Sequence, residues 1–161
     1  MGCGVSAFTG LGRGGRSSVT RLASEEGASK GSLSPFTSPM AYAVLNWGFT
    51  EPRFSSRYNY SKENGTFTCK KCGNELYRSD DKYDSGSGWP SFTSAVVEGE
   101  SSNVEKKPRD ATGRFEIVCK SCGGHLGHVF PDGPSKAKGG TGWRHCVNGA
   151  ALDFSKKTSD E

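Results

Sequence analysis

The amino-acid sequence predicts a mainly antiparallel β domain that folds around one structural zinc ion. Phe115 and Ile117 alternate with polar neighbours, which is the period-two pattern of a half-buried strand. No long amphipathic pattern follows Gly48, so we expect little helix after that point. Two Cys-x-x-Cys pairs offer the four thiolates of a tetrahedral zinc site, namely Cys69, Cys72, Cys119 and Cys122.

The composition favours a small domain that needs such a metal staple. Only 32% of the 161 residues are hydrophobic and 23 are glycine, which is little apolar side chain for one core. The net charge of +4 comes with Lys and Arg scattered along the chain, so we expect no nucleic-acid partner. No apolar run has the length of a transmembrane segment or a secretory signal. We therefore expect a soluble intracellular monomer whose cysteines meet a reducing compartment.

The chain divides into a leader, one domain and a short tail. Residues 1–33 are rich in Gly, Ser and Thr and poor in large apolar side chains, which predicts disorder. The domain is expected at residues 34–156, and residues 157–161 form the tail.

Two further interpretations of the leader stay open. Gly2 begins an N-myristoylation pattern, and Cys3 is placed for a second acyl chain, which would associate the protein with a membrane surface. Residues 1–24 instead contain arginines and no acid, which suits a transit peptide for a plastid or mitochondrion. Without either signal the protein would be cytoplasmic.

A short helix is expected at the start of the domain. Ser38 is a suitable N-cap, Pro39 a suitable first helical residue and Gly48 a stop signal. Its apolar face is expected to comprise Met40, Val44, Leu45 and Trp47. Beyond the helix, further strands are expected at residues 91–97 and 143–148.

The two cysteine pairs belong to an internal repeat. Cys, Lys, Cys, Gly and Leu recur at the same offsets in residues 69–76 and 119–126. Two residues between the thiolates let both reach one ion, and the following glycine permits the tight turn behind them. A four-sulfur site leaves no open position for a substrate, so its role is structural. Two disulfides, a redox-active pair, or iron at the same ligands are the alternatives.

Cys146 is a candidate nucleophile within the strand expected at residues 143–148. Side chains alternate across a strand, which puts Arg144, Cys146 and Asn148 on one face. A guanidinium beside a thiol favours the thiolate, which is the reactive form. An inert, packed cysteine is the simpler alternative.

A second polar group lies close by in the sequence. His125, His128 and Asp132 follow the second cysteine pair, and a histidine can donate a proton near neutral pH. Packing roles for these histidines and for Trp89 are the alternatives. His145 points to the strand face opposite Cys146, so we expect it to be a packing residue.

Together these segments resemble the methionine-R-sulfoxide reductases, the B-type peptide-methionine (R)-S-oxide reductases. The resemblance runs from about residue 34 to residue 154 and depends on several motifs in a fixed order. They are residues 48–52, the two cysteine pairs, KYDSGSGWPSF at 82–92, GHLGHVFPDGP at 124–134, and RHCVNGAAL at 144–152.

The resemblance implies two packed antiparallel sheets and an enzyme that repairs proteins after oxidative stress. Its reaction would be the reduction of the R epimer of methionine sulfoxide in oxidised proteins. Cys146 would attack the sulfoxide sulfur and become a sulfenic acid, and Trp89 would pack against the substrate methyl group.

The remaining candidate residues match positions that surround the sulfoxide in this family. His125, His128 and Asn148 match the residues that bind and protonate the sulfoxide oxygen. Asp132 and Arg144 match those that orient this network and stabilise the thiolate.

One departure from the family concerns the second half of the catalytic cycle. Many members carry a resolving cysteine where this chain has Ser87. Thioredoxin, glutathione or glutaredoxin could reduce the sulfenic acid instead, or Cys3 could do so from the leader. We expect an external reductant to dominate, because Cys3 lies about 30 residues before the domain and its effective concentration is low.

A non-enzymatic zinc module that binds protein or nucleic acid is the rival hypothesis. Paired Cys-x-x-Cys motifs with nearby lysines occur in such modules, and one fold hosts unrelated functions. The lysines in question are Lys70, Lys71, Lys106 and Lys107. Against this rival, a binding module has no need of Cys146 beside Arg144 and Asn148.

Overall fold

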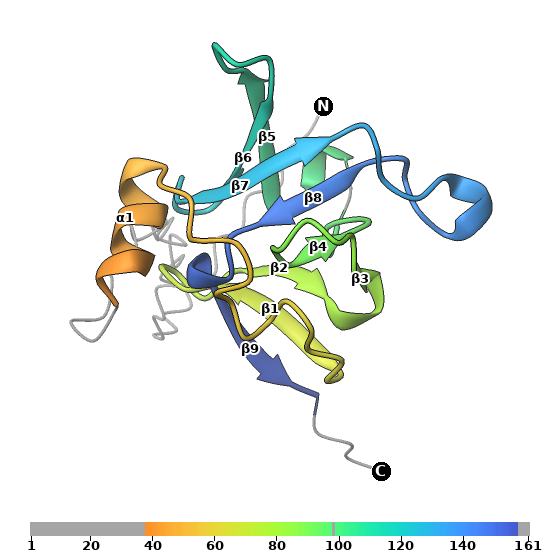
Figure 1. Ribbon diagram of the computed structural model, residues 1–161, viewed down its shortest axis with the longest axis horizontal. Helices are drawn as coiled ribbons and strands as arrows, with labels where there is room; N and C mark the ends of the chain where they lie inside the picture. The colour runs from red at the N-terminus through yellow and green to blue at the C-terminus, as the bar shows by residue number, and fades with distance from the viewer. Residues whose placement is uncertain (1–37, 98, 158–161) are drawn as a thin grey trace, which may run out of the picture.

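The computed structural model describes residues 38–97 and 99–157 and contains two antiparallel sheets (Figure 1). One sheet has three strands in the order β2-β1-β9, and the other has six in the order β3-β4-β8-β7-β6-β5. The prediction of a mainly β fold with two antiparallel sheets is confirmed. The strands are β1 (Gly65–Cys69), β2 (Glu75–Arg78), β3 (Lys82–Tyr83), β4 (Ser91–Phe92), β5 (Val104–Arg109), β6 (Phe115–Cys119), β7 (His125–Phe130), β8 (Arg144–Val147) and β9 (Leu152–Lys156).

The helix α1 (Pro39–Trp47) begins and ends where the sequence predicts. The Ser38 hydroxyl accepts a hydrogen bond of 3.2 Å from the backbone N–H of Ala41, which is an N-cap. Gly48 ends the helix in the left-handed conformation with φ of 70°. The helix packs against β7 and against the short 3-10 helix η4 (Gly149–Ala151) (Figure 1).

The predicted apolar face of α1 is correct in part. Met40 and Trp47 are 41% and 66% exposed, so these two residues are not part of the buried face. The face that packs against the domain is Ala41, Val44 and Leu45, which follow the i, i+3, i+4 spacing of one helix side. Trp47 instead packs edge-on against Tyr42, with ring centroids 5.3 Å apart, on the outer surface.

The strand expected at residues 143–148 is confirmed as β8, whereas the strand expected at 91–97 is wrong beyond Phe92. The backbone N–H of Thr93 still donates to the carbonyl of Asp81 next to β3, whereas that of Val96 donates to the carbonyl of Leu76 in β2 of the smaller sheet. The chain therefore leaves the larger sheet after two residues and is bound to the smaller one. Hydrophobic alternation alone does not reveal such a change of partner.

An aromatic core fills the space between the two sheets. Tyr77 of β2 stacks on Phe92 of β4 with ring centroids 4.3 Å apart, and Phe67 of β1 lies edge-on to Phe92 at 5.1 Å. All three rings are buried, and each such burial stabilises the fold by about 1.5–3 kcal/mol. After β8 the chain crosses through η4 to β9 in the smaller sheet, so the end of β8 lies at the junction of the two sheets.

Candidate functional site

The two Cys-x-x-Cys segments fold into the same turn. The N–H of Gly73 donates to the carbonyl of Cys69 at 2.7 Å, and the N–H of Gly123 donates to that of Cys119 at 2.8 Å. Both glycines have positive φ, 75° and 69°, which other residues rarely adopt. The repeat in the sequence is therefore a repeat in conformation, and it brings two thiols to the end of each sheet.

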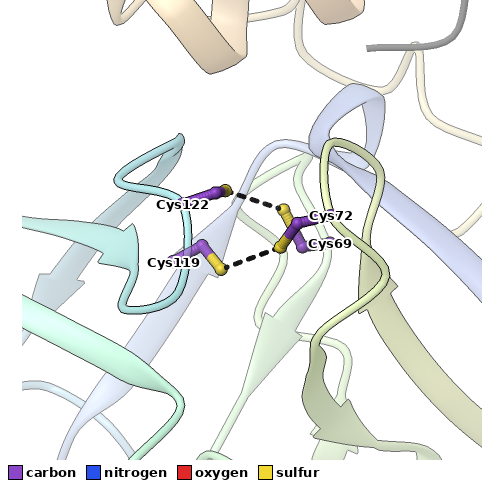
Figure 2. Close-up of side chains that lie close together, drawn as sticks. All are labelled: Cys69, Cys72, Cys119 and Cys122. Atoms are coloured by element: carbon purple, nitrogen blue, oxygen red, sulfur yellow. Dashed lines mark hydrogen bonds between the residues drawn. The ribbon is translucent and has the colours of Figure 1, made fainter. Parts of the chain in front are cut away.

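The four thiols of these turns form one cluster (Figure 2). Cys69 Sγ lies 3.7 Å from Cys122 Sγ, and Cys72 Sγ lies 3.6 Å from Cys119 Sγ. Sulfurs at the corners of a tetrahedron with Zn–S bonds of about 2.3 Å are about 3.8 Å apart, whereas a disulfide requires about 2 Å. The four cysteines are free and spaced as metal ligands rather than paired in two disulfides.

The chemistry of the cluster also suits a cation. Contact between the two thiols lowers the pKa of Cys119 and raises that of Cys69, so the pair loses one proton readily, and loss of the second is favoured by a bound cation. The side-chain amide of Asn74, which is not itself a ligand, donates to Cys119 Sγ at 3.8 Å and helps to orient that sulfur. The cluster can bind a metal ion through four sulfurs and offers it no open position.

The remaining described cysteine, Cys146, lies in a row of side chains that crosses the larger sheet. Cys146 in β8 pairs with His128 in β7 on one side and with Ser91 in β4 on the other. His128 in turn pairs with Glu116 in β6. Directly opposed residues in antiparallel strands project to the same face, so the four side chains line one surface.

A small cavity of about 80 Å³ opens on this surface beside the half-buried Cys146. Gly127 lets β7 approach, because a Cβ there would lie 2.1 Å from the Cys146 carbonyl oxygen. The cavity is lined by Thr50, Trp89, Arg114, Gly127, His128, Phe130, Cys146, Val147 and Asn148. It is large enough for a sulfur with its methyl group and has both an aromatic wall and hydrogen-bonding groups.

Glu51, which is not among the residues predicted from the sequence, fastens two walls of this cavity. Its backbone N–H donates to Asn148 Oδ1 at 3.0 Å, and its carbonyl accepts from Trp89 Nε1 at 3.0 Å. Its buried carboxylate accepts from the N–H groups of Gly149 and Ala150 at 2.6 and 2.8 Å. Burial raises the pKa of Glu51, and these two N–H bonds oppose that shift.

Asn148 is held in one orientation at the end of β8. Its Oδ1 accepts from Glu51, and its Nδ2 donates to the carbonyl of Leu126 at 3.0 Å. The second Nδ2 hydrogen remains for a group in the cavity. The buried amide is therefore fixed as a donor toward the cavity.

His125 lies behind His128 rather than on the cavity wall. Its Nδ1 contacts Glu116 Oε1 at 2.6 Å, and because a carboxylate only accepts, Nδ1 carries the proton. Its Nε2 is buried and has no hydrogen-bond partner among the described residues. The two imidazole rings lie edge to face with centroids 5.5 Å apart.

His128 lines the cavity beneath the β5–β6 hairpin. Burial lowers the pKa of His128, and the charges of Arg114 and His125 lower it further. Asp110 acts in the opposite direction, with its Oδ2 3.8 Å from His128 Nε2. A hydrogen bond from the Thr112 hydroxyl and one from the Arg114 backbone hold the pKa of Asp110 at about 2, so this carboxylate stays ionised.

Arg144 and Asp132 lie beside Cys146 and outside the cavity lining. Arg144 donates Nε and Nη2 to the two carboxylate oxygens of Asp132, at 2.9 and 2.8 Å. Burial raises the pKa of Cys146, whereas the Ser87 hydroxyl and the Arg144 charge lower it. The predicted effect of Arg144 on the thiol is thus present, and burial outweighs it.

His145 lies on the opposite side of β8 from Cys146, where the alternation predicts it. Its Nδ1 is 3.2 Å from the Tyr77 hydroxyl, in the core between the sheets. Burial and the charge of Lys106 lower the pKa of His145 to about 4. The imidazole is therefore neutral near pH 7 and serves the core.

The lysines that favoured a nucleic-acid module all have partners within the chain. Lys70 contacts Asp153, Lys71 donates to Asn46, Lys107 donates to Glu105, and Lys106 lies over the Trp143 ring at 4.1 Å.

The predicted residues thus fall into three positions around Cys146. The cavity wall holds Trp89, His128 and Asn148. His125 lies behind His128, and the Arg144–Asp132 pair lies beside Cys146, outside the lining. Glu51, Arg114 and Glu116 were missed. The one sequence signal for Glu51 is that it lies in the motif of residues 48–52, one of the segments that carry the family resemblance.

Comparisons with known proteins identify the family of this chain. The family model described as the SelR domain matches residues 37–156. The peptide methionine sulfoxide reductase MsrB of Bradyrhizobium diazoefficiens is 49% identical over 122 residues, which cover 74% of this chain and 83% of that protein. That of Methanosarcina barkeri is 44% identical over 123 residues, 76% of this chain and 82% of that protein. Within its described part, the chain has no helix with the length and apolar character to cross a bilayer.

Proposed function

The chain belongs to the SelR-domain family of MsrB peptide methionine sulfoxide reductases, and we propose that it reduces the R epimer of methionine sulfoxide in oxidised proteins through Cys146. The observation that carries this proposal is the position of Cys146. It borders a cavity of about 80 Å³ with an aromatic ring, an imidazole and a carboxamide on its walls. An inert packed cysteine would have no such arrangement around it.

The proposed reaction transfers one oxygen from substrate sulfur to enzyme sulfur. The thiolate of Cys146 attacks the sulfoxide sulfur and forms a bond to it, while the sulfoxide oxygen takes up a proton. When the sulfur–sulfur bond breaks with the oxygen transferred, the sulfoxide is reduced to a thioether. Cys146 is oxidised to a sulfenic acid, so one sulfoxide and one thiol give one thioether and one sulfenic acid.

The groups around the cavity supply the proton and the hydrogen bonds that this step needs. His128 is the proposed proton donor, with His125 behind it and Glu116 holding the His125 ring. Asn148 donates to the sulfoxide oxygen from the orientation that Glu51 imposes. The step needs protonated His128 together with the Cys146 thiolate, and the pKa of His128 is lowered whereas that of Cys146 is raised. The fraction of enzyme in this form is greatest between the two pKa values, so turnover should fall as the pH drops below the His128 titration and as it rises above the Cys146 titration.

Arg144 and Trp89 act on the thiolate and on the substrate respectively. Arg144 stabilises the Cys146 thiolate and is held in place by Asp132. Trp89 receives the substrate methyl group, and Glu51 fixes its indole. With the methyl on Trp89 and the oxygen toward His128 and Asn148, only one epimer presents its sulfur to Cys146, which is the basis for R selectivity.

The sulfenic acid then has to meet a second thiol, and an external reductant is the proposed source. Ser87 lies 3.9 Å from Cys146 Sγ, where a hydroxyl cannot form a disulfide. Thioredoxin, or glutathione with glutaredoxin, would complete the cycle as part of protein repair after oxidative stress. The structure does not describe Cys3 or the residues of the acylation and transit patterns. The proposed compartment is the cytoplasm, a plastid or a mitochondrion.

A zinc ion is the proposed occupant of the four-cysteine cluster. Cys69 and Cys72 would hold it from the β1–β2 turn, and Cys119 and Cys122 from the β6–β7 turn. The ion would cross-link the two sheets and take no part in the reaction. Metal analysis of the purified protein should give about one zinc per chain.

Turnover of separated epimers tests the proposal. The wild type and Cys146→Ser would be given each epimer of N-blocked methionine sulfoxide, with dithiothreitol as reductant. We expect loss of the R epimer alone, and a fall of at least about a thousandfold in the variant because its nucleophile is gone. No turnover of either epimer by a folded, zinc-containing protein would favour the non-enzymatic module instead.

A further inference from the structure

We propose that three serine hydroxyls, those of Ser91, Ser85 and Ser87, form a hydrogen-bonded chain that ends on Cys146 Sγ and stabilises its thiolate. The inference deepens the proposed function, since it rests on Cys146 being the nucleophile. Ser87 is then a catalytic residue because it touches the reacting sulfur, and Ser85 and Ser91 are positioning residues that act through it.

The distances along this chain are continuous. Ser91 Oγ lies 2.7 Å from Ser85 Oγ, and Ser85 Oγ lies 2.8 Å from Ser87 Oγ. Ser87 Oγ lies 3.9 Å from Cys146 Sγ, within the range for a hydrogen bond to the larger sulfur atom. Ser91 is fully buried, so the far end of the chain is sealed from solvent.

Each hydroxyl has one proton, and the chain uses each proton once. With a thiolate at Cys146, Ser87 donates to Sγ, Ser85 donates to Ser87 and Ser91 donates to Ser85. The carbonyl of Trp89 is the competing acceptor, at 3.2 Å from Ser91 and 3.4 Å from Ser87. These contacts are longer than those between the hydroxyls, so a negative charge on sulfur favours the chain. Hydrogen bonds in a row polarise one another, which strengthens the last one.

The backbone around Ser87 is fixed, which keeps its hydroxyl near the sulfur. Gly86 has φ of 68°, and its N–H donates to Asp84 Oδ1 at 2.8 Å, which closes the turn before Ser87. Arg53 Nε donates to the Ser87 carbonyl at 2.9 Å, and the guanidinium lies over the Trp89 ring at 5.6 Å. The loop is thus held from both sides, and a hydroxyl at position 87 needs little ordering to reach Cys146.

The site has a physical need for this donor. Burial disfavours the charged form of the Cys146 thiol, and Arg144 is already engaged by both oxygens of Asp132. A neutral hydroxyl donates to the thiolate without requiring a compensating charge in the half-buried site.

The test measures thiolate formation directly and needs no turnover. Iodoacetamide alkylation of Cys146 would be followed against pH, read by mass spectrometry on the tryptic peptide of residues 145–156, which has one cysteine. We expect Ser87→Ala to raise the alkylation midpoint by about one pH unit, which lowers the rate near pH 7 about tenfold. Ser85→Ala should raise it by a smaller amount, and Ser87→Thr, which keeps the hydroxyl, should restore the wild-type midpoint.

Ser135→Ala, at an exposed serine outside the site, is the matched control and should leave the midpoint unchanged. An unchanged midpoint in Ser87→Ala overturns the proposal. A higher alkylation midpoint in Ser87→Ala with an unchanged midpoint in Ser85→Ala overturns the hydrogen-bonded chain of hydroxyls, since Ser87 would then act alone. A midpoint shift in a protein that fails to reduce methionine sulfoxide would leave the chain standing and remove the proposed reaction, so the two failures are distinguishable.

Discussion

The four-cysteine cluster and the cavity beside Cys146 are built in different ways. The cluster is assembled from two short segments that fold into the same turn, each from a motif of eight residues. The cavity takes its walls from five separate stretches between Thr50 and Asn148. A site made of local turns is visible in the sequence, whereas a site made by strand pairing exists only once the sheets have formed.

This difference separates what each site contributes. The cluster joins the ends of two sheets and has no position for a substrate, so damage to it should appear as loss of the fold. Cys146 itself contributes little to the stability of the fold, so its substitution should lower turnover and leave the protein folded. Substitutions chosen at each site can break this division or sharpen it.

The largest effect is expected at the cluster. Cys119→Ala removes a ligand and should abolish zinc binding and cost several kcal/mol, a large part of the stability of a small domain at about 5–15 kcal/mol. Cys146→Ser, the matched cysteine outside the cluster, should unfold at nearly the wild-type temperature with zinc retained. Metal content and thermal unfolding of both variants measure this, and a folded, zinc-free Cys119→Ala protein would contradict the structural role.

How much the sequence reveals follows the same division. The caps of α1, the strand β8 and the four cysteines were predicted, because each depends on a few adjacent residues. The exposure of Trp47 and the early end of β4 at Phe92 were not, because both depend on contacts with distant segments. For the same reason Glu51 was missed, since its partners lie almost a hundred residues away in sequence.

The next largest effect is expected for Glu51→Gln, which tests whether one residue contributes both to the stability of the fold and to the shape of the cavity. An amide retains the shape but loses the charge and turns an N–H₂ group toward the N–H of Gly149 or Ala150. We expect a loss of about 2–4 kcal/mol in unfolding free energy and a fall of about tenfold or more in kcat, because the carboxylate holds in place the Glu51 backbone groups that bind Asn148 and Trp89. Denaturant unfolding and turnover measure the two effects.

Glu63→Gln is the matched control for that substitution. Its side chain is 62% exposed and its carboxylate lies 3.7 Å from Lys156 Nζ, so we expect a change below about 0.5 kcal/mol and normal turnover. If Glu51→Gln lowered stability while kcat stayed at the wild-type level, Glu51 would be a structural residue with no influence on the cavity.

The smallest effect concerns His145, which is next to Cys146 in sequence and yet faces the core. Its pKa is lowered from 6.5 to about 4 by burial and by Lys106, so between these values the unfolded chain binds more protons than the folded one. Stability should therefore fall as the pH drops from 6.5 toward 4, by up to about 3 kcal/mol. His145→Gln does not titrate and can still bond to the Tyr77 hydroxyl, so its stability should depend less on pH in this window.

The comparison of the two proteins isolates this contribution, because protonation of the cysteine cluster at low pH affects both equally. Urea unfolding of the wild type and of His145→Gln at several pH values between 7 and 4 gives the difference in slope. Parallel curves would mean that His145 is no more buried than in the unfolded chain. His145 would then be exposed to solvent like the cavity beside Cys146, and it would not be part of the core between the sheets.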